Sequence, residues 1–276
     1  MTPFEVVGAG PPLVLIPGID GRCEFVQPAT EALARSFRVL TFSLCGERGS
    51  GARFDPALGF DNYTRQVLTA LDRHRVDRAT VCGMSFGGRA AIRFAAAHPD
   101  RTAALVLAST PGPNWRMRGR HRLYTRAPHL LGPLFFVESP HRLNPELAAA
   151  FPSLRDRWRF TWRQCARFVS APLSPSRMAA RARLVDATSP EIDCSVIAAP
   201  TLIVTGEPAL DRVVDVADTG TYVARIAGAQ HRILARTGHL GPLTRPDAFA
   251  SMVREFVESC RGEHVTAGGH GNRATA

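Results

Sequence analysis

The stretch ATVCGMSFGG, residues 79–88, decides the fold of this 276-residue chain. Its first four residues form an apolar run typical of a buried strand, and the residues from Phe86 to His98 have the spacing of a helix. Ser85 then occupies a strained strand-to-helix turn, where the flanking glycines leave room that side chains would fill. Its hydroxyl is expected to stand exposed at the edge of the sheet, above the positive end of a helix. The alternative is a tight turn in which Ser85 only caps the helix.

Short apolar runs and helical patterns alternate along most of the chain. The strand-like runs are Leu13–Ile16, Val39–Phe42, Ala79–Cys82, Ala104–Ala108, Thr201–Thr205 and His231–Leu234. Helical spacing is found at Gln27–Arg35, Asp61–Arg75 and Phe86–His98, near Asp218–Arg225 and near Pro246–Ser259. Such alternation predicts right-handed βαβ units, and nearly continuous apolar strands fit a sheet covered on both faces. The sequence therefore predicts an α/β protein with a mostly parallel central sheet and helices on both faces.

The alternation is interrupted between the fourth and fifth of these runs by a segment of different composition. The chain contains no lysine, and 14 of its 34 arginines lie in residues 113–185, against three acidic residues. This segment accounts for the whole net charge of +10 and contains all three tryptophans. We interpret 113–185 as an arginine-rich helical cap inserted into one core, which comprises 1–112 and 186–260. The glycine-rich tail 261–276 is expected to be disordered.

Arginine and tryptophan alternate within the cap in a pattern that allows three interpretations. Two sets of residues recur at intervals of four, namely Trp158 and Trp162, and Arg155, Arg159 and Arg163. On a helix this spacing places the tryptophans on one stripe and the arginines on another. A lid helix, anchored on the core by its tryptophans with its arginines in solvent, accounts for the pattern best. An anionic partner, either an acidic substrate or a negatively charged surface, is the second interpretation. Nucleic acid is the third, and we expect no nucleic-acid partner.

Other features of the composition exclude several kinds of chemistry. A chain without lysine cannot form a Schiff base with substrate or pyridoxal phosphate, and it has no P-loop. The six cysteines lack CxxC spacing, so no zinc cage or redox motif is visible, and we expect no metal. The N-terminal MTPFEVVGAG does not have the pattern of a signal peptide. No apolar run approaches the roughly 18 residues of a membrane span. These observations predict a cytoplasmic protein without a membrane span.

Five stretches together resemble the α/β-hydrolase family. They are LVLIPGIDG (13–21), CGMSFGGRAAIRFAAAHPDR (82–101), RTAALVLAST (101–110), APTLIVTGE (199–207) and RTGHLG (236–241). The resemblance extends over about residues 4–259, apart from the insertion. It implies the fold of that family, in which a serine nucleophile, an acid and a histidine follow one another along the chain. The nucleophile is then Ser85.

The catalytic base is expected to be His239. A serine hydroxyl is a poor nucleophile until a base takes its proton, so a histidine must reach Ser85. Of the nine histidines, His239 lies on the loop between the last predicted strand and the last predicted helix. That loop emerges at the same edge of the sheet as Ser85, and it matches the position of the family's catalytic histidine.

The acid that orients the histidine is expected in the loop GEPALDRVVD, residues 206–215. This loop offers Glu207, Asp211 and Asp215. Members of the family usually have an aspartate four residues before a proline here, and Asp211 fits if Asp215 stands at the proline position. Asp211 is therefore predicted to orient the imidazole and to stabilise its charged form. Asp215 is the alternative.

The oxyanion hole needs two backbone N–H donors. One is expected to be Phe86, directly after the nucleophile. The other is expected to be Ile19, because Pro17-Gly18-Ile19 resembles the His-Gly-x of the family. Asp20 is expected to point away, since a carboxylate would oppose the developing negative charge.

These residues together predict a serine hydrolase that cleaves a carboxylic ester or a related acyl bond without a cofactor. Two alternatives remain open. One is an enol-lactone or C–C bond hydrolase that uses the same three residues, and the other is a ligand-binding protein of the same fold with weak turnover. The expected partner is a small-molecule substrate, and an acidic one would suit the basic cap. The chain is expected to be a monomer or a homodimer.

Overall fold

The computed structural model describes residues 4–188 and 193–268. Within them, seven strands form one sheet in the order β1-β3-β2-β4-β5-β6-β7. The strands are β1 (Glu5–Val7), β2 (Pro12–Ile16), β3 (Arg38–Thr41), β4 (Ala79–Met84), β5 (Thr102–Ala108), β6 (Thr201–Thr205) and β7 (Gln230–Ile233). All neighbours are parallel except β1 and β3, which pair antiparallel at the edge. The predicted α/β class with a mostly parallel sheet is confirmed.

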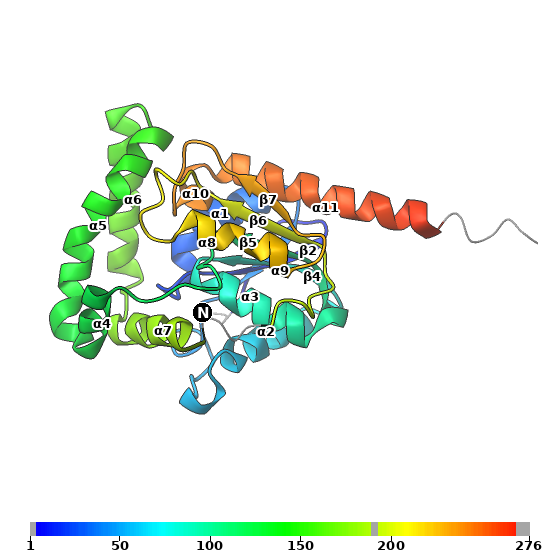
Figure 1. Cartoon of the computed structure of the whole chain (residues 1–276), viewed down its shortest axis with the longest axis horizontal. Helices are drawn as coiled ribbons and strands as arrows, with labels where there is room; N and C mark the ends of the chain where they lie inside the picture. Colours follow the sequence, from blue (N-terminus) through cyan, green and yellow to red (C-terminus); the bar gives the residue numbers. More distant parts are fainter. Residues whose placement is uncertain (1–3, 189–192, 269–276) are drawn as a thin grey trace, which may run out of the picture.

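Helices cover both faces of this sheet (Figure 1). On one face lie α2 (Asp61–Arg73), α3 (Phe86–Ala97) and α9 (Tyr222–Arg225), and on the other lie α1 (Gln27–Leu33) and α11 (Pro246–Gly268). The shorter helices are α8 (Val216–Gly220), α10 (Gly241–Thr244) and the 3-10 turns η1 (Cys23–Val26), η2 (Pro56–Leu58) and η3 (Pro99–Arg101).

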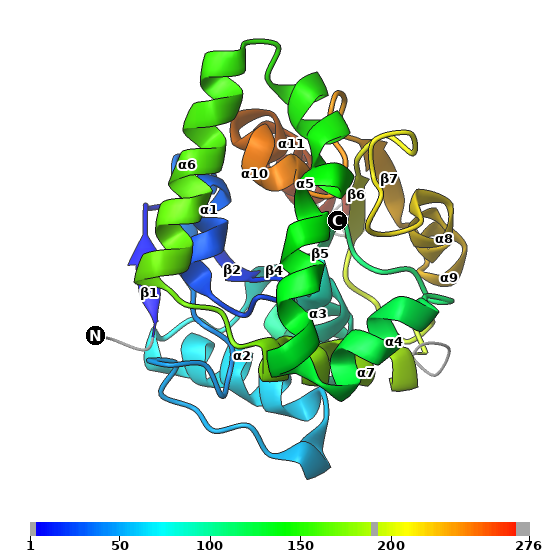
Figure 2. The same ribbon diagram turned by 90° about the vertical axis from the view of Figure 1, so that its left-hand side faces the viewer.

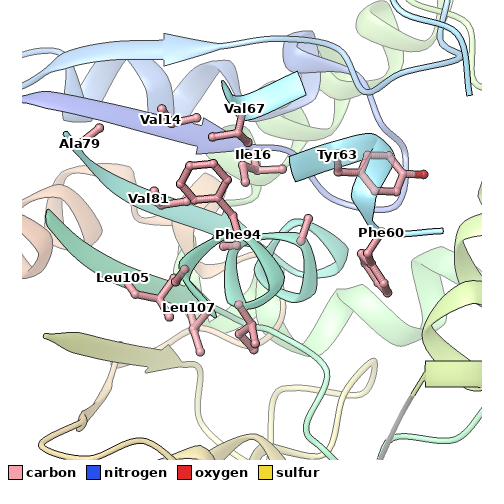
Figure 3. Close-up of a cluster of buried hydrophobic side chains, with 14 of the residues drawn as sticks. Val14, Ile16, Phe60, Tyr63, Val67, Ala79, Val81, Phe94, Leu105 and Leu107 are labelled. Atoms are coloured by element: carbon pink, nitrogen blue, oxygen red, sulfur yellow. The ribbon is translucent and has the colours of Figure 1, made fainter. Parts of the chain in front are cut away.

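Two apolar clusters, one on each face, explain why the central strands are apolar throughout. Successive side chains of a strand point to opposite faces. In β2, Val14 and Ile16 therefore enter the cluster beneath α2 and α3, while Leu13 and Leu15 enter the cluster beneath α1 and α11. Figure 3 shows the first cluster, where these β2 residues meet Phe94 of α3. The edge strand β1 is short and mostly exposed, so it lacks this signature and was not predicted.

The chain leaves the sheet after β5 and returns at β6, its neighbour in the sheet. Between them lie α4 (Gly119–Arg126), α5 (Pro128–Ala150), α6 (Leu154–Ser170) and α7 (Pro175–Thr188), which we call the cap. Figures 1 and 2 show these four helices together at one side of the sheet, and in Figure 2 α5 and α6 are separated below the turn that joins them. The segment 113–185 contains the first three helices and most of the fourth.

Two of the three tryptophans do not anchor the cap, so this prediction is wrong. Trp158 and Trp162 are 69% and 62% exposed, whereas Trp115 packs against the core. The spacing predicts correctly that Trp158 and Trp162 share one stripe of α6, but it does not say which side of the helix faces inward. That side carries Phe160 and Phe168, which border a cavity described below.

The predicted disorder of residues 261–276 is wrong for 261–268, which continue α11 to Gly268. A single glycine inside a helix, here Gly262, costs only about 1 kcal/mol, so it does not end a helix that is already packed on the sheet. Residues 269–276 lie outside the described residues. With 23 residues each, α5 and α11 are long, yet no helix in the described part of the chain is long and apolar enough to cross a membrane.

Candidate active site

Ser85 lies at the turn between β4 and α3 in a backbone conformation that residues other than glycine rarely adopt. Its φ is 51° and its ψ is −118°. The Ser85 N–H donates to the Ala108 carbonyl at 2.8 Å, and the Gly88 N–H donates to the Ser85 carbonyl at 2.9 Å. Such strain persists only where the surrounding structure imposes it. The turn places Ser85 on the wall of a cavity between the core and the cap.

Two glycines allow α3 to approach the strands at this turn. A Cβ atom at Gly83 would lie 2.2 Å from the carbonyl oxygen of Gly87. A Cβ atom at Gly87 would lie 2.3 Å from the carbonyl oxygen of Ile16. Because these obstacles are backbone atoms, any other residue would push α3 away from the sheet. The glycines therefore have the steric role that the sequence predicts for them.

The structure brings Ser85, His239 and Asp211 together. His239 lies in the loop between β7 and α10, and its Nε2 atom is 3.0 Å from Ser85 Oγ. On the other side of the ring, His239 Nδ1 is 3.5 Å from Asp211 Oδ2. This second distance is that of an ion pair and exceeds an ordinary hydrogen bond. In sites without substrate such contacts are often long, and they shorten in the reactive complex.

The two candidate acids have different surroundings. The Asp211 side chain is fully buried, and its Oδ1 atom accepts the N–H groups of Val213 at 2.9 Å and Val214 at 3.0 Å. These two bonds leave Oδ2 to face His239. Asp215 accepts the N–H of Ala217 at 2.9 Å and caps the start of α8. Among the two, Asp211 is thus the carboxylate beside the imidazole.

Neighbouring charges and hydrogen bonds affect the pKa values of His239 and Asp211 more than burial does. Burial alone would lower the pKa of His239, but the Asp211 and Glu146 carboxylates raise it above its ordinary value. Burial alone would raise the pKa of Asp211, but His239 and the N–H groups of Val214 and Val213 lower it below its ordinary value. The site therefore favours an ionised aspartate and stabilises a positive charge on the imidazole.

The cap contributes a buried carboxylate, Glu146, that sequence reasoning missed. Glu146 lies near the end of α5, is 1% exposed, and accepts the N–H of Leu240 at 3.0 Å through Oε2. Burial raises its pKa, while the N–H groups of Leu240 and Gly238 oppose that effect. Glu146 thus holds the loop that carries His239. In the sequence it is one of three acids in a basic segment, and no motif marks it.

The two predicted oxyanion donors, Ile19 and Phe86, border the same cavity as Ser85. Phe86 is the first residue of α3. The carbonyl of Ile19 accepts a hydrogen bond from Arg181 Nη1 of α7 at 3.0 Å. Arg181 in turn pairs with Glu47 at 2.7 Å, and both side chains are at most 3% exposed. A second cap residue that the sequence did not reveal therefore fixes the loop that carries Ile19.

Asp20, which is expected to point away from the oxyanion position, is held by a backbone N–H group. Its Oδ1 atom accepts the N–H of Arg22 at 2.9 Å, but the residue still borders the cavity. Burial raises the pKa of Asp20 to about 6, although the Arg22 N–H and Arg181 lower it. The carboxyl therefore loses its opposing negative charge in mildly acidic solution.

The cavity has a volume of about 1450 Å³, and mostly apolar residues of the cap and the core line it. Arg142 of α5 also borders it and is only 9% exposed. A mostly apolar wall with a few polar groups that orient the ligand is the lining found in small-molecule sites. No group of three or more His, Cys, Asp or Glu side chains in the described ranges could hold a metal ion.

A family model described as "Alpha/beta hydrolase family" matches residues 13–252 of the chain. The protein belongs to the α/β-hydrolase family. This match confirms the resemblance carried by the five sequence stretches, and it covers both parts of the core together with the cap.

Individual α/β hydrolases resemble the chain over most of its length. It is 27% identical to 2-hydroxymuconate semialdehyde hydrolase of Pseudomonas sp. (strain CF600), over 91% of this chain and 88% of that protein. It is also 27% identical to poly(3-hydroxyalkanoate) depolymerase of Ectopseudomonas oleovorans, over 92% of this chain and 87% of that protein. The enol-lactonase from Burkholderia xenovorans LB400 has the same fold, with a TM-score of 0.72 and 23% sequence identity. The match covers 92% of this chain and 95% of that structure.

Replacing Glu146 tests its effect on His239 directly. In Glu146→Gln a negative charge next to the imidazole is lost, so the pKa of His239 falls and the ring releases its proton at lower pH. An NMR titration of the His239 imidazole signals measures this shift. Glu138→Gln, on the same helix, is the matched control and should leave the midpoint unchanged. An unchanged or higher midpoint in Glu146→Gln would contradict the assignment.

Removing Arg181 tests the buried pair beneath the Ile19 loop. Arg181→Met leaves Glu47 buried without its cation, which should lower the free energy of unfolding by about 3–5 kcal/mol. The double variant Arg181→Met/Glu47→Leu removes both charges and should recover most of that loss. Urea denaturation measures both values. A double variant no more stable than the single one would show that the ion pair is not the cause.

Proposed function

We propose that this α/β hydrolase cleaves a carboxylic ester or a related acyl bond through an acyl-enzyme on Ser85. The observation that carries the proposal is the 3.0 Å contact between Ser85 Oγ and His239 Nε2, with the Asp211 carboxylate on the far side of the imidazole. This order supplies a nucleophile, a base and an acid that orients the base. The hydrolases among its relatives support hydrolysis as the class of reaction.

In the first half of the reaction, Ser85 Oγ attacks the carbonyl carbon and His239 Nε2 takes its proton. The carbonyl electron pair moves to oxygen, which the N–H groups of Phe86 and Ile19 stabilise. When the carbonyl re-forms, the bond to the leaving oxygen breaks, and that oxygen takes the proton from His239. An alcohol departs and the acyl group stays on Ser85.

In the second half, water replaces the alcohol. His239 takes a proton from the water as its oxygen attacks the acyl carbon, and it returns that proton to Ser85 Oγ when the ester bond to Ser85 breaks. A carboxylic acid departs. Asp211 holds the imidazole and stabilises its positive charge in both halves, so it stays ionised throughout. The reaction needs no group beyond these residues and water.

We propose a largely apolar small-molecule substrate, because most of the cavity wall is apolar. An acidic group on that substrate would be attracted to Arg142, which borders the cavity from α5. The 27% identity to a poly(3-hydroxyalkanoate) depolymerase supports ester cleavage, since that polymer is a polyester.

A second candidate keeps the same three residues and changes the bond. That bond is an enol-lactone or a C–C bond beside a carbonyl group, and the 27% identity to 2-hydroxymuconate semialdehyde hydrolase supports a substrate other than a simple ester. A substrate panel separates the two candidates. Simple esters, an enol-lactone and a vinylogous diketone are offered to the same enzyme, and the highest kcat/KM identifies the bond.

Ser85→Ala should abolish ester hydrolysis without unfolding the protein. Loss of a triad member costs on the order of 10⁴-fold in turnover or more. The assay is hydrolysis of a p-nitrophenyl ester, with thermal unfolding as the control for stability. A fluorophosphonate probe should label the parent protein and not Ser85→Ala. Unlabelled parent protein would instead favour a ligand-binding role.

The two acids should differ sharply in their effect on kcat. Asp211→Asn removes the charge beside His239 and should lower kcat by roughly 10⁴-fold, since the wrong imidazole tautomer is then favoured. Asp215→Asn keeps a side-chain oxygen that can cap α8, so kcat should change little. Steady-state kinetics of the two variants provide the comparison. The reverse order would assign the acid to Asp215.

A further inference from the structure

One side of the cap helix α6 is apolar and exposed to solvent. Its members are spaced by four or seven residues, and they are Leu154, Trp158, Trp162 and Val169. Their exposed fractions are 74%, 69%, 62% and 85%. We call these four residues the α6 stripe. The Trp158 and Trp162 rings stack with centroids 5.6 Å apart and planes 3° from parallel.

Three arginines run beside the stripe. They are Arg155, Arg159 and Arg163, and each directly follows one of the first three stripe residues in the sequence. One residue corresponds to about 100° around a helix, so the arginines lie on the side next to the stripe. All three are exposed, and none forms an ion pair in the part of the chain that the structure describes. Asp156 is the one acidic residue on α6. The helix therefore presents an apolar band with a positive border.

The third side of α6 faces the cavity. None of the four stripe residues borders it, and the residues of α6 that do are Phe160, Thr161, Gln164, Cys165 and Phe168. Figure 2 shows α6 at the margin of the cap, separated from α5 below the turn that joins them. The inward contacts of α6 thus leave the stripe uncovered. Two stacked tryptophans that are both exposed to water are unusual on the surface of a soluble protein. Contiguous exposed apolar side chains mark sites of interaction.

We propose that the α6 stripe docks the cap onto an anionic lipid surface. Tryptophan is favoured at the level of lipid headgroups, where its ring is buried and its N–H can meet water or a headgroup. The bordering arginines can bury their stems and keep their guanidinium groups among anionic headgroups. A helix with this division of apolar and basic sides lies in the plane of an interface.

Charge decides between this surface and a second copy of the chain. Residues 113–185 contain 14 arginines and three acids, so two caps brought together through their α6 stripes would repel each other. An anionic surface instead attracts the same charges. Docking through the stripe would also bring the cavity wall at Phe160 and Phe168 within about 10 Å of the lipid, the width of one helix.

The test is flotation of the full chain with two kinds of vesicle. One is phosphatidylcholine alone, and the other is phosphatidylcholine mixed with phosphatidylglycerol. The parent protein should partition roughly 100-fold more strongly onto the anionic vesicles, and added salt should weaken this preference. Trp158→Ala/Trp162→Ala should weaken anionic binding by about tenfold or more, because it removes most of the apolar band. Arg155→Gln/Arg159→Gln/Arg163→Gln should abolish the preference for anionic vesicles.

Matched controls separate the stripe from general basicity. Arg53→Gln/Arg65→Gln/Arg75→Gln removes the same charge from exposed positions of the core and should leave most of the binding intact. Val223→Ala, at an exposed apolar position of the core, is the control for the tryptophans. Thermal unfolding and hydrolysis of a water-soluble ester show that each variant remains folded.

Three results would overturn the proposal. The first is an absence of vesicle binding by the parent protein, or equal binding to both kinds of vesicle. The second is an equal loss of binding in the core arginine variant. The third is a dimer of the parent chain, seen by light scattering, that dissociates in Trp158→Ala/Trp162→Ala, since the stripe would then be a self-association surface.

Discussion

The contact between α3 and the end of β2 is the constraint on which the site depends. Gly87 lies so close to the Ile16 carbonyl that no Cβ fits between them. This approach fixes the turn at Ser85 with its φ of 51°, and it places Phe86 at the start of α3 beside the cavity. The loop that follows β2 therefore lies next to Ser85. One steric condition in the core sets the positions of Ser85, the proposed nucleophile, and of both predicted oxyanion donors.

The cap holds the site together from the opposite side. Glu146 of α5 binds the loop that carries His239, and Arg181 of α7 binds the loop that carries Ile19. Both side chains are almost completely buried, so their bonds face little competition from water. The positions of His239, the proposed base, and of Ile19, a proposed oxyanion donor, thus depend on the position of the cap. The cap forms a wall of the cavity and also orders the loops of the core beneath it.

The sequence predicts the parts of the site that lie next to strand ends. Ser85 follows β4 directly, His239 follows β7, and Asp211 follows β6, so local patterns and chain order suffice to place them at one edge of the sheet. Contacts across the chain leave no such pattern. Glu146 meets a residue 94 positions away and Arg181 one 162 positions away. The stripe of α6 was visible as a spacing, but periodicity does not say which side of a helix packs inward.

The position of the cap in the chain has a consequence for how the protein can change. β5 and β6 are hydrogen-bonded neighbours in the sheet, yet residues 109–200 lie between them in the chain. Their pairing must wait for a long loop to close, which slows folding. The entropy of closure grows only slowly with length, by about 0.6 kcal/mol for each doubling. Insertions and deletions between α5 and α6 therefore cost the sheet little, provided that Glu146 and Arg181 keep their partners. The cap residues that line the cavity can therefore differ between related proteins while the core keeps its structure.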